Sequence, residues 1–334
     1  MNPLRGSRWL TRLLVAVALP ASAVTACSAT DASPEVSGSS GASARTADPT
    51  VDKLAQVLKR GTLVLSTDLE YPPSSMAVEG ATRASPTKCQ ATQLTAGEVT
   101  GYDVETGEMV AAAMGVEPCF VTPSWTQIVS GTWGDRWDVS WGTGNINEER
   151  MSRLWMTQPY MAEPTRVFVR EDSSYKDPSE LSGVRVGACA GCSDEAYLRG
   201  ELRLPGIEFD NMIKDPEVVL FDLEGPGLDA VGAGQIEGFV ASERVGMEAI
   251  AAGVPLRALD PPLFTGMSTG FVDRNSGLQD AAFVSRINEI LDQLHADGTF
   301  KALSLKYFGT DYATDAGRFD LATIGQDVNG ESGT

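Results

Sequence analysis

Residues 59–80 begin with Lys-Arg-Gly-Thr-Leu-Val-Leu-Ser-Thr-Asp-Leu-Glu-Tyr-Pro-Pro, in which an apolar run passes directly into polar and aromatic residues. The run over 62–66 predicts a short buried strand. It is the first of several strand signals that alternate with helix signals along the chain, and this alternation decides the fold class.

Helix signals follow the strand signals at regular intervals. A helix is expected over 104–114, with Gly115 as its stop. Near the other end of the chain, apolar residues at i, i+4, i+7, i+8 and i+11 predict an amphipathic helix. These apolar residues are Phe283, Ile287, Ile290, Leu291 and Leu294. The further strand signals lie at 167–169, 184–186, 219–221 and 239–240. Alternating strands and helices predict an α/β fold that binds ligands at the carboxyl ends of its strands.

The composition excludes several classes of function. The 334 residues carry 26 Lys and Arg against 45 Asp and Glu, a formal net charge of −19. This acidic balance speaks against a nucleic-acid partner, because phosphate binding needs basic side chains that displace counterions. The single histidine, His295, leaves little room for a histidine metal site or for a nucleophile–histidine–acid triad. We therefore expect no metal, no cofactor and no enzymatic activity.

The N-terminal residues 1–26 have the layout of a secretory signal, with three arginines, an apolar run and small residues before Cys27. A cysteine in this place resembles the bacterial lipoprotein box, in which the cysteine is acylated. An ordinary cleaved signal followed by a stray cysteine is the alternative. We expect Cys27 to carry a lipid that holds the exported protein at the outer face of the cell membrane. Residues 27–50, rich in Ser, Ala, Thr and Gly, are expected to be a flexible tether.

The cysteines that remain after Cys27 are even in number, which suggests two disulfides in an oxidising compartment. We favour the pairs Cys89–Cys119 and Cys189–Cys192 over the other two connectivities. The Cys-Ala-Gly-Cys run at 189–192 follows a strand signal and precedes a helix-like stretch, so it could also be a redox motif. Half of a zinc site is a further alternative, but no second CxxC or histidine pair completes it.

Four motifs in a fixed order resemble the family 3 extracellular solute-binding proteins, which are the polar amino-acid receptors of ABC importers. They are the opening stretch 59–80, Gly-Tyr-Asp-Val-Glu at 101–105, the stretch 138–150 with Gln-Pro-Tyr at 158–160, and Asp-Gly-Thr-Phe at 297–300 with Lys-Tyr-Phe-Gly at 306–309. Each motif alone is weak, whereas four in the right order are strong. The resemblance covers about residues 55–310.

The resemblance implies a two-lobe α/β fold of the periplasmic-binding-protein type II. Each lobe is a sheet flanked by helices, and the second lobe is inserted into the first. Accordingly, we expect residues 51–163 and 267–312 to form lobe 1 and residues 164–266 to form lobe 2. Residues 313–334 are expected to be a C-terminal extension and tail.

The resemblance also implies a binding site between the lobes, part of it on lobe 1. Arg150 matches the family arginine that grips the ligand carboxylate, and a planar guanidinium suits this role because it offers two parallel charge-assisted bonds. The alternative is a solvated arginine paired with a neighbouring glutamate. Thr143 and Asn145 fall in the turn that supplies further donors. Tyr71 and Trp125 match the aromatic pair that sandwiches the ligand, although either could be a core residue.

The remaining site residues show where this chain departs from the family. Asp68 matches an acidic position near the ligand and could equally cap a turn. Gly191 and Cys192 match a turn at a helix start whose free main-chain amides bind an anion. Ser242 stands where many members place an aspartate that holds the ligand's α-ammonium. A hydroxyl cannot supply that charge, so either Asp68 or Glu243 replaces it or the ligand is not an ordinary α-amino acid.

The function expected from these features is that of a lipid-anchored, monomeric substrate-binding component of an ABC importer. It would capture a small anionic or zwitterionic solute, such as an amino acid or related carboxylate, by closing its lobes, and then meet a membrane permease. Two alternatives remain open. One is a dehydratase-like enzyme on the same fold, with Asp68 or Glu243 as acid or base. The other is a surface receptor that signals to a separate partner.

Overall fold

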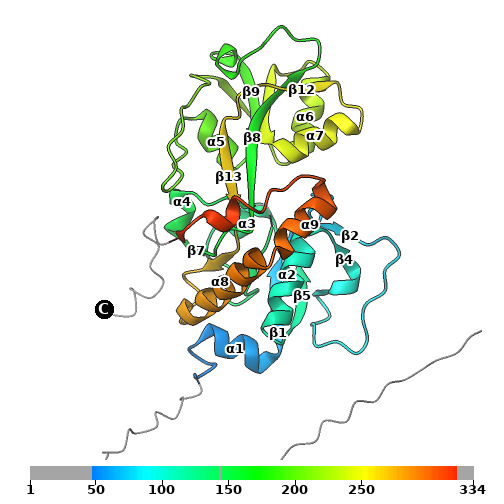
Figure 1. The fold of residues 1–334 in the computed structure, drawn as a ribbon, viewed down its shortest axis with the longest axis vertical. Helices are drawn as coiled ribbons and strands as arrows, with labels where there is room; N and C mark the ends of the chain where they lie inside the picture. The colour runs from blue at the N-terminus through cyan, green and yellow to red at the C-terminus, as the bar shows by residue number, and fades with distance from the viewer. Residues whose placement is uncertain (1–46, 143, 322–334) are drawn as a thin grey trace, which may run out of the picture. The chain divides into compact units, whose positions relative to one another are not determined.

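A computed structural model describes residues 47–142 and 144–321 of the chain. In Figure 1 these residues form two α/β lobes that are joined by the strands β8 and β13. The α-helices are α1 (Lys53–Arg60), α2 (Tyr102–Ala113), α3 (Trp125–Val129), α4 (Glu148–Met151), α5 (Ser193–Leu198), α6 (Glu224–Gly232), α7 (Glu243–Ala251), α8 (Ala281–Ala296) and α9 (Thr299–Phe308). The 3₁₀ helices are η1 (Ala96–Glu98), η2 (Pro178–Leu181) and η3 (Ala316–Arg318). The expected signal 1–26, Cys27 and Thr143 lie outside the described residues, as do most of the tether and the end of the tail.

The first lobe is built on a mixed sheet in which the strands lie in the order β3-β5-β1-β6-β14-β7. Its strands are β1 (Thr62–Ser66), β3 (Leu94–Thr95), β5 (Glu117–Val121), β6 (Val139–Ser140), β7 (Leu154–Met156) and β14 (Phe271–Asp273). The central strand β1 runs parallel to β5 and β6 and is buried along its whole length. A strand buried on both faces reads as a continuous apolar run, as 62–66 does. A small ribbon of β2 (Met76–Ala77) and β4 (Val99–Thr100) lies beside this sheet.

The second lobe is built on a mixed sheet with strands in the order β10-β9-β11-β8-β12, and β13 pairs with β8. Its strands are β8 (Met161–Arg170), β9 (Arg185–Cys189), β10 (Glu217–Phe221), β11 (Gly238–Ser242), β12 (Leu256–Ala258) and β13 (Phe264–Ser268). All of them lie between β7 and β14 in the sequence, so the second lobe is an insertion in the first. The expected two-lobe α/β fold is therefore confirmed. The expected lobe boundaries fall inside β8 and β13, which connect the lobes, and they stay a prediction.

Local sequence signals account for the ends of several helices. Asp52 caps α1 by accepting a hydrogen bond from the amide of Ala55, and Gly61 ends it in the left-handed conformation with φ of 73°. Gly101 precedes α2 with φ of 131°, and a Cβ there would lie 2.3 Å from the carbonyl oxygen of Ser74. The turn into α2 therefore requires glycine.

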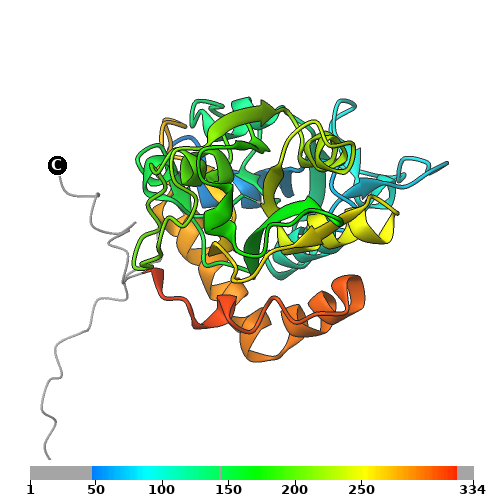
Figure 2. The same ribbon diagram turned by 90° about the horizontal axis from the view of Figure 1, so that it is seen from above.

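The last described residues pack against the region where the lobes meet. The carbonyl of Tyr312 accepts a hydrogen bond of 2.7 Å from the amide of Ala162 in β8. The side chain of Gln158 donates to the carbonyl of Phe319, and Leu321 is buried in a cluster of the first lobe. Figure 2 shows α8, α9 and this segment along one flank of the fold. The described part of the expected C-terminal extension, residues 313–321, therefore packs against the first lobe and the strand β8.

The described residues contain the disulfides Cys89–Cys119 and Cys189–Cys192, each with its Cα atoms 5.5 Å apart. The first ties the loop before β3 to strand β5 of the first sheet. The second closes the turn between β9 and α5. In the part of the chain that the structure covers, no helix is long and apolar enough to pass through a bilayer.

The disulfide Cys89–Cys119 is expected to stabilise the fold through the 30-residue separation that it closes. Replacing both cysteines with alanine should lower the free energy of unfolding by about 3 kcal/mol, because the unfolded chain regains the entropy of the open loop. Urea denaturation of the ligand-free protein measures this change. The matched control is alanine at both Cys189 and Cys192; their disulfide closes a separation of 3 residues, so its removal should cost clearly less. Equal losses would contradict the loop-length explanation.

Candidate ligand-binding site

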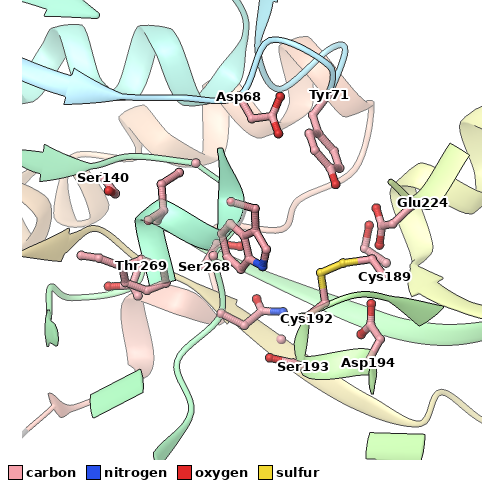
Figure 3. A pocket seen from close by; sticks show the side chains of 18 of the residues that line it. Asp68, Tyr71, Ser140, Cys189, Cys192, Ser193, Asp194, Glu224, Ser268 and Thr269 are labelled. Atoms are coloured by element: carbon pink, nitrogen blue, oxygen red, sulfur yellow. A yellow bond between two sulfur atoms is a disulfide. The ribbon is translucent and has the colours of Figure 1, made fainter. Parts of the chain in front are cut away.

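A cavity of about 100 Å³ lies between the two sheets. Its lining comes from the carboxyl ends of strands in both lobes, where α/β proteins bind ligands. Residues at or just after these strand ends include Ser66 and Asp68 after β1, Ser140 at the end of β6, Cys189 at the end of β9, Asp222 and Glu224 after β10, and Ser242 at the end of β11. Figure 3 shows the lining side chains of both lobes facing this space.

Arg150 lines the cavity from α4 and is 3 % exposed. The helix begins at Asn147, whose side chain accepts a hydrogen bond from the Arg150 amide. The guanidinium donates to the carbonyl of Asn145 at 2.7 Å and, in the other lobe, to the carbonyl of Gly191 at 3.1 Å. Its Cζ lies 4.9 Å from the ring centroid of Trp125. Arg150 therefore faces the cavity and links the two lobes.

The charge of Arg150 is not matched by a carboxylate. Within the described ranges it forms no ion pair, and the acceptors of its guanidinium are neutral main-chain carbonyls. Burial lowers the pKa of Arg150 to about 10, so the guanidinium remains charged at neutral pH. A desolvated guanidinium with only neutral acceptors is suited to exchange one of them for a carboxylate, which makes a stronger, charge-assisted bond.

The aromatic residues Tyr71 and Trp125 lie on the first-lobe side of the cavity, and both are half-buried. The indole nitrogen of Trp125 donates to the carbonyl of Gly191 at 3.3 Å. Burial, with the carboxylates of Glu224, Asp68 and Asp194, raises the pKa of the Tyr71 phenol far above its ordinary value, so this hydroxyl stays protonated.

Acidic residues dominate the second-lobe side of the cavity. Asp194 and Glu224 are 6 % and 8 % exposed, and both line the space. Burial raises the pKa of Glu224 to about 7, against its ordinary 4.5. Burial and the neighbouring charge of Glu224 raise the pKa of Asp194 well above its ordinary value. The third buried acid, Glu163, accepts a hydrogen bond of 2.6 Å from the amide of Arg244 and lies 3.8 Å from its guanidinium.

The structure brings most of the expected site residues to this cavity. Its lining includes Asp68, Tyr71, Trp125, Asn145, Arg150, Cys192 and Ser242, whereas Thr143 lies outside the described residues. Asp68 also accepts a hydrogen bond from the amide of Glu70, so it caps a turn and faces the cavity at once. Glu243 points elsewhere: it forms an ion pair with Arg166 and accepts a hydrogen bond from the hydroxyl of Tyr312.

The turn at Gly191 and Cys192 differs from the expectation of free main-chain amides. The amide of Gly191 donates to the carboxylate of Glu195 at 2.8 Å, and the amide of Cys192 donates to the carbonyl of Cys189 at 3.3 Å. Glu195 is part of α5 and folds back over the turn. Because both amides are already bonded, this turn presents the carbonyl of Gly191 to the first lobe instead of an anion site.

Sequence reasoning missed Asp194, Glu224, Glu163 and Arg244, all of which line the cavity. A signal was available for the first two. Asp194 follows the strand signal at 184–186 and the Cys-Ala-Gly-Cys run, and Glu224 comes three residues after the strand signal at 219–221. Acidic residues directly after two strands of an α/β fold are candidates for the same site.

Comparisons with known proteins agree with the two-lobe α/β fold. The family model of the bacterial extracellular solute-binding proteins, family 3, matches residues 81–310 of the sequence. The chain is 23 % identical over 260 residues to the L-cystine-binding protein TcyJ of Escherichia coli strain K12, covering 77 % of this chain and 86 % of the relative. It is 26 % identical over 223 residues to the L-arginine-binding protein of Pseudomonas aeruginosa, covering 64 % and 82 %.

Among solved structures, the chain resembles the ancestral amino-acid-binding protein AncCDT-1, a precursor of cyclohexadienyl dehydratase. The TM-score is 0.61 at 21 % identity, and the match covers 77 % of this chain and 99 % of the other. At this identity the likeness concerns the fold.

The raised pKa of Glu224 predicts how stability depends on pH. The folded protein keeps this proton up to pH about 7, whereas the unfolded chain releases it near 4.5, so Glu224 favours the folded state at low pH. That contribution is lost as the pH rises from about 4.5 through about 7. Compared with wild type, Glu224→Gln should therefore gain stability between pH 5 and pH 8 in urea denaturation without ligand. The exposed Glu217→Gln is the control, and a pH-independent difference for Glu224→Gln would contradict this interpretation.

Proposed function

This chain belongs to the family 3 bacterial extracellular solute-binding proteins, and we propose that it is the substrate-binding component of an ABC importer for an amino acid. The observation that carries the proposal is the guanidinium of Arg150, buried in a cavity between two lobes with no carboxylate partner among the described residues. A solute carboxylate there would make two parallel charge-assisted bonds, which a lysine in the same place could not.

The relatives support an amino acid as the solute. Their names state that one binds L-cystine and another binds L-arginine. We extend this class of solute to the present chain, because its cavity combines a cationic residue, Arg150, with carboxylates such as Glu224. A zwitterion presents both opposite charges, whereas a simple anion would meet the acidic side unfavourably.

Capture of the solute is proposed to occur by closure of the two lobes. Arg150 and Trp125 belong to the first lobe and already reach Gly191 of the second. A solute held between them contacts both lobes only when they are together, so its binding energy favours the closed arrangement. The closed form is then the one that a membrane permease recognises.

The setting of the protein is part of the proposal. Cleavage before Cys27 and acylation of this cysteine would hold the chain, as a monomer, on the outer face of the cell membrane. The lobes would comprise residues 51–163 with 267–312 and residues 164–266.

We propose binding without chemical conversion. His295, the single histidine of the sequence, lies outside the cavity, where its ring nitrogen bonds to the carbonyl of Pro159 and its ring packs against Phe300. The relatives named above are binding proteins. The acids in the cavity are therefore assigned to recognition of the solute.

A thermal-shift panel of the common amino acids, L-cystine and small dicarboxylates tests the function. A matching solute at 100 times its Kd should stabilise the mature chain by about 2.7 kcal/mol, because it binds only the folded state. The expected result is a shift for one or a few amino acids and none for the dicarboxylates. A panel without any shift would count decisively against a transport role.

Arg150→Ala tests the residue that carries the proposal. Affinity for the amino acid found in the panel should fall by about 2–5 kcal/mol, because a buried charge pair is broken. Arg150→Lys should recover only part of this loss, since an ammonium lacks the planar fork. Isothermal titration calorimetry measures both, with Arg153→Ala, a half-buried neighbour paired with Glu149, as the control. Undiminished affinity in Arg150→Ala would remove Arg150 from the site.

A further inference from the structure

Two buried carboxylates of the second lobe face the cavity, and neither forms an ion pair with any residue that the structure describes. Asp194 lies in the first turn of α5, which follows β9, and Glu224 is the first residue of α6, which follows β10. The strands β9 and β10 are neighbours in the sheet. In Figure 3 both side chains lie on the same side of the cavity, with the hydroxyl of Tyr71 directed toward them. Each is more than nine-tenths buried.

The Asp194 carboxylate has no hydrogen bond and no ion pair with any residue in the described ranges, although it lines the cavity. Burying a carboxylate without partners is costly unless it takes up a proton or a partner arrives. The electrostatic neighbours of Asp194 are the acids Glu224 and Glu163 and the guanidinium of Arg150. Its surroundings thus leave a place for one more positive group.

The guanidinium of Arg244 does not fill that place. It lies 3.8 Å from Glu163 and 3.5 Å from Glu248, so it is shared between two other carboxylates. Arg150 in turn is held by the carbonyls of Asn145 and Gly191. Among the described residues, neither arginine therefore forms an ion pair with Asp194 or Glu224, although the charge of Arg244 acts on Glu224 from a longer distance.

Ser242 connects this pair with the departure from the family pattern. It ends β11, which lies next to β9 in the sheet, and it lines the same cavity. The carboxylate of Glu224 faces the main-chain N–H of Ser242, which stabilises its charged form. Glu224 thus brings a carboxylate to the position where the family resemblance places one at residue 242 itself.

We propose that Asp194 and Glu224 together form a subsite that binds a cationic nitrogen group of the solute, an ammonium or a guanidinium, in place of a single carboxylate at position 242. The inference rests on the proposed function and adds the residues that hold the cation of the solute. The hydroxyl of Tyr71 and the carboxylate of Asp68 lie near the same end of the cavity and add further acceptors.

The test uses three probes that differ in one charge each. L-arginine carries an α-ammonium, a carboxylate and a guanidinium; L-citrulline replaces the guanidinium with a neutral group of the same shape; 5-guanidinopentanoate lacks the α-ammonium. Calorimetry with the mature wild-type chain should show that removing one of the two cations weakens binding about 30-fold or more. Loss with L-citrulline assigns the subsite to a side-chain cation, and loss with 5-guanidinopentanoate assigns it to the α-ammonium. Equal affinity for all three probes would overturn the proposal.

The variants Asp194→Asn and Glu224→Gln keep the size of each side chain and remove its charge. Each variant should weaken binding of the probe that wild type prefers by about 30-fold or more. Each should also reduce the ratio between the affinity for this probe and the affinity for the probe that lacks the recognised cation. The narrowed ratio is the deciding readout, because a folding defect would lower both affinities together. Glu217→Gln, an exposed residue paired with Arg185, is the matched control and should leave every affinity unchanged.

The outcomes separate this inference from the proposed function. If wild type binds an amino acid and both variants bind it within twofold of wild type, the carboxylate subsite is wrong and the receptor role stands. The subsite is also wrong if glutarate, which carries no cation, binds wild type more tightly than L-arginine does. If no amino acid binds wild type at all, the proposed function fails and the subsite fails with it.

Discussion

The structure depends on one desolvated cation, the guanidinium of Arg150. A charge taken out of water must be surrounded by acceptors or by polarisable ring faces. The first lobe supplies the carbonyl of Asn145 and the ring of Trp125, and the second lobe supplies the carbonyl of Gly191. Because these acceptors come from both lobes, burial of Arg150 requires that the lobes meet. Arg150 therefore both connects the lobes and supplies the positive charge of the cavity.

The second-lobe lining of the cavity carries an excess of acidic groups. Arg244 is shared by Glu163 and Glu248, which leaves Asp194 and Glu224 without an ion pair among the described residues. Burial then shifts both carboxyl groups toward their protonated forms, as their raised pKa values indicate. Such a pair can stay buried by holding a proton, and it can meet a cation by releasing one. Arg150 and the acidic pair thus differ in the sign of their charge and in what stabilises them, since neutral carbonyls hold Arg150 and a bound proton neutralises the acids.

The sequence predicted the fold more fully than the site, for a physical reason. Strands such as 62–66 and the helix around 283–294 are marked by local apolar patterns, and the structure has them as β1 and α8. The pairing of Asp194 with Glu224 depends instead on the strand order β10-β9-β11, which joins residues 30 positions apart. Glu243 shows the converse, that closeness in sequence does not ensure a shared site. It adjoins Ser242 in sequence, yet the turn from β11 into α7 directs it to Arg166.

The bonds of the Gly191 turn indicate how recognition and lobe contact are coupled. Its amide is held by Glu195, so its free carbonyl is what meets Arg150 and Trp125. A carbonyl is a weaker acceptor for a guanidinium than a carboxylate is. In the proposed function, a solute carboxylate would displace this carbonyl with a net gain in free energy. The disulfide Cys189–Cys192 closes the turn, which would reduce the entropy lost when the solute binds. Under the proposed function, the same guanidinium would change from bridging the lobes directly to bridging them through the solute, which would couple recognition of the solute's charge to closure of the lobes.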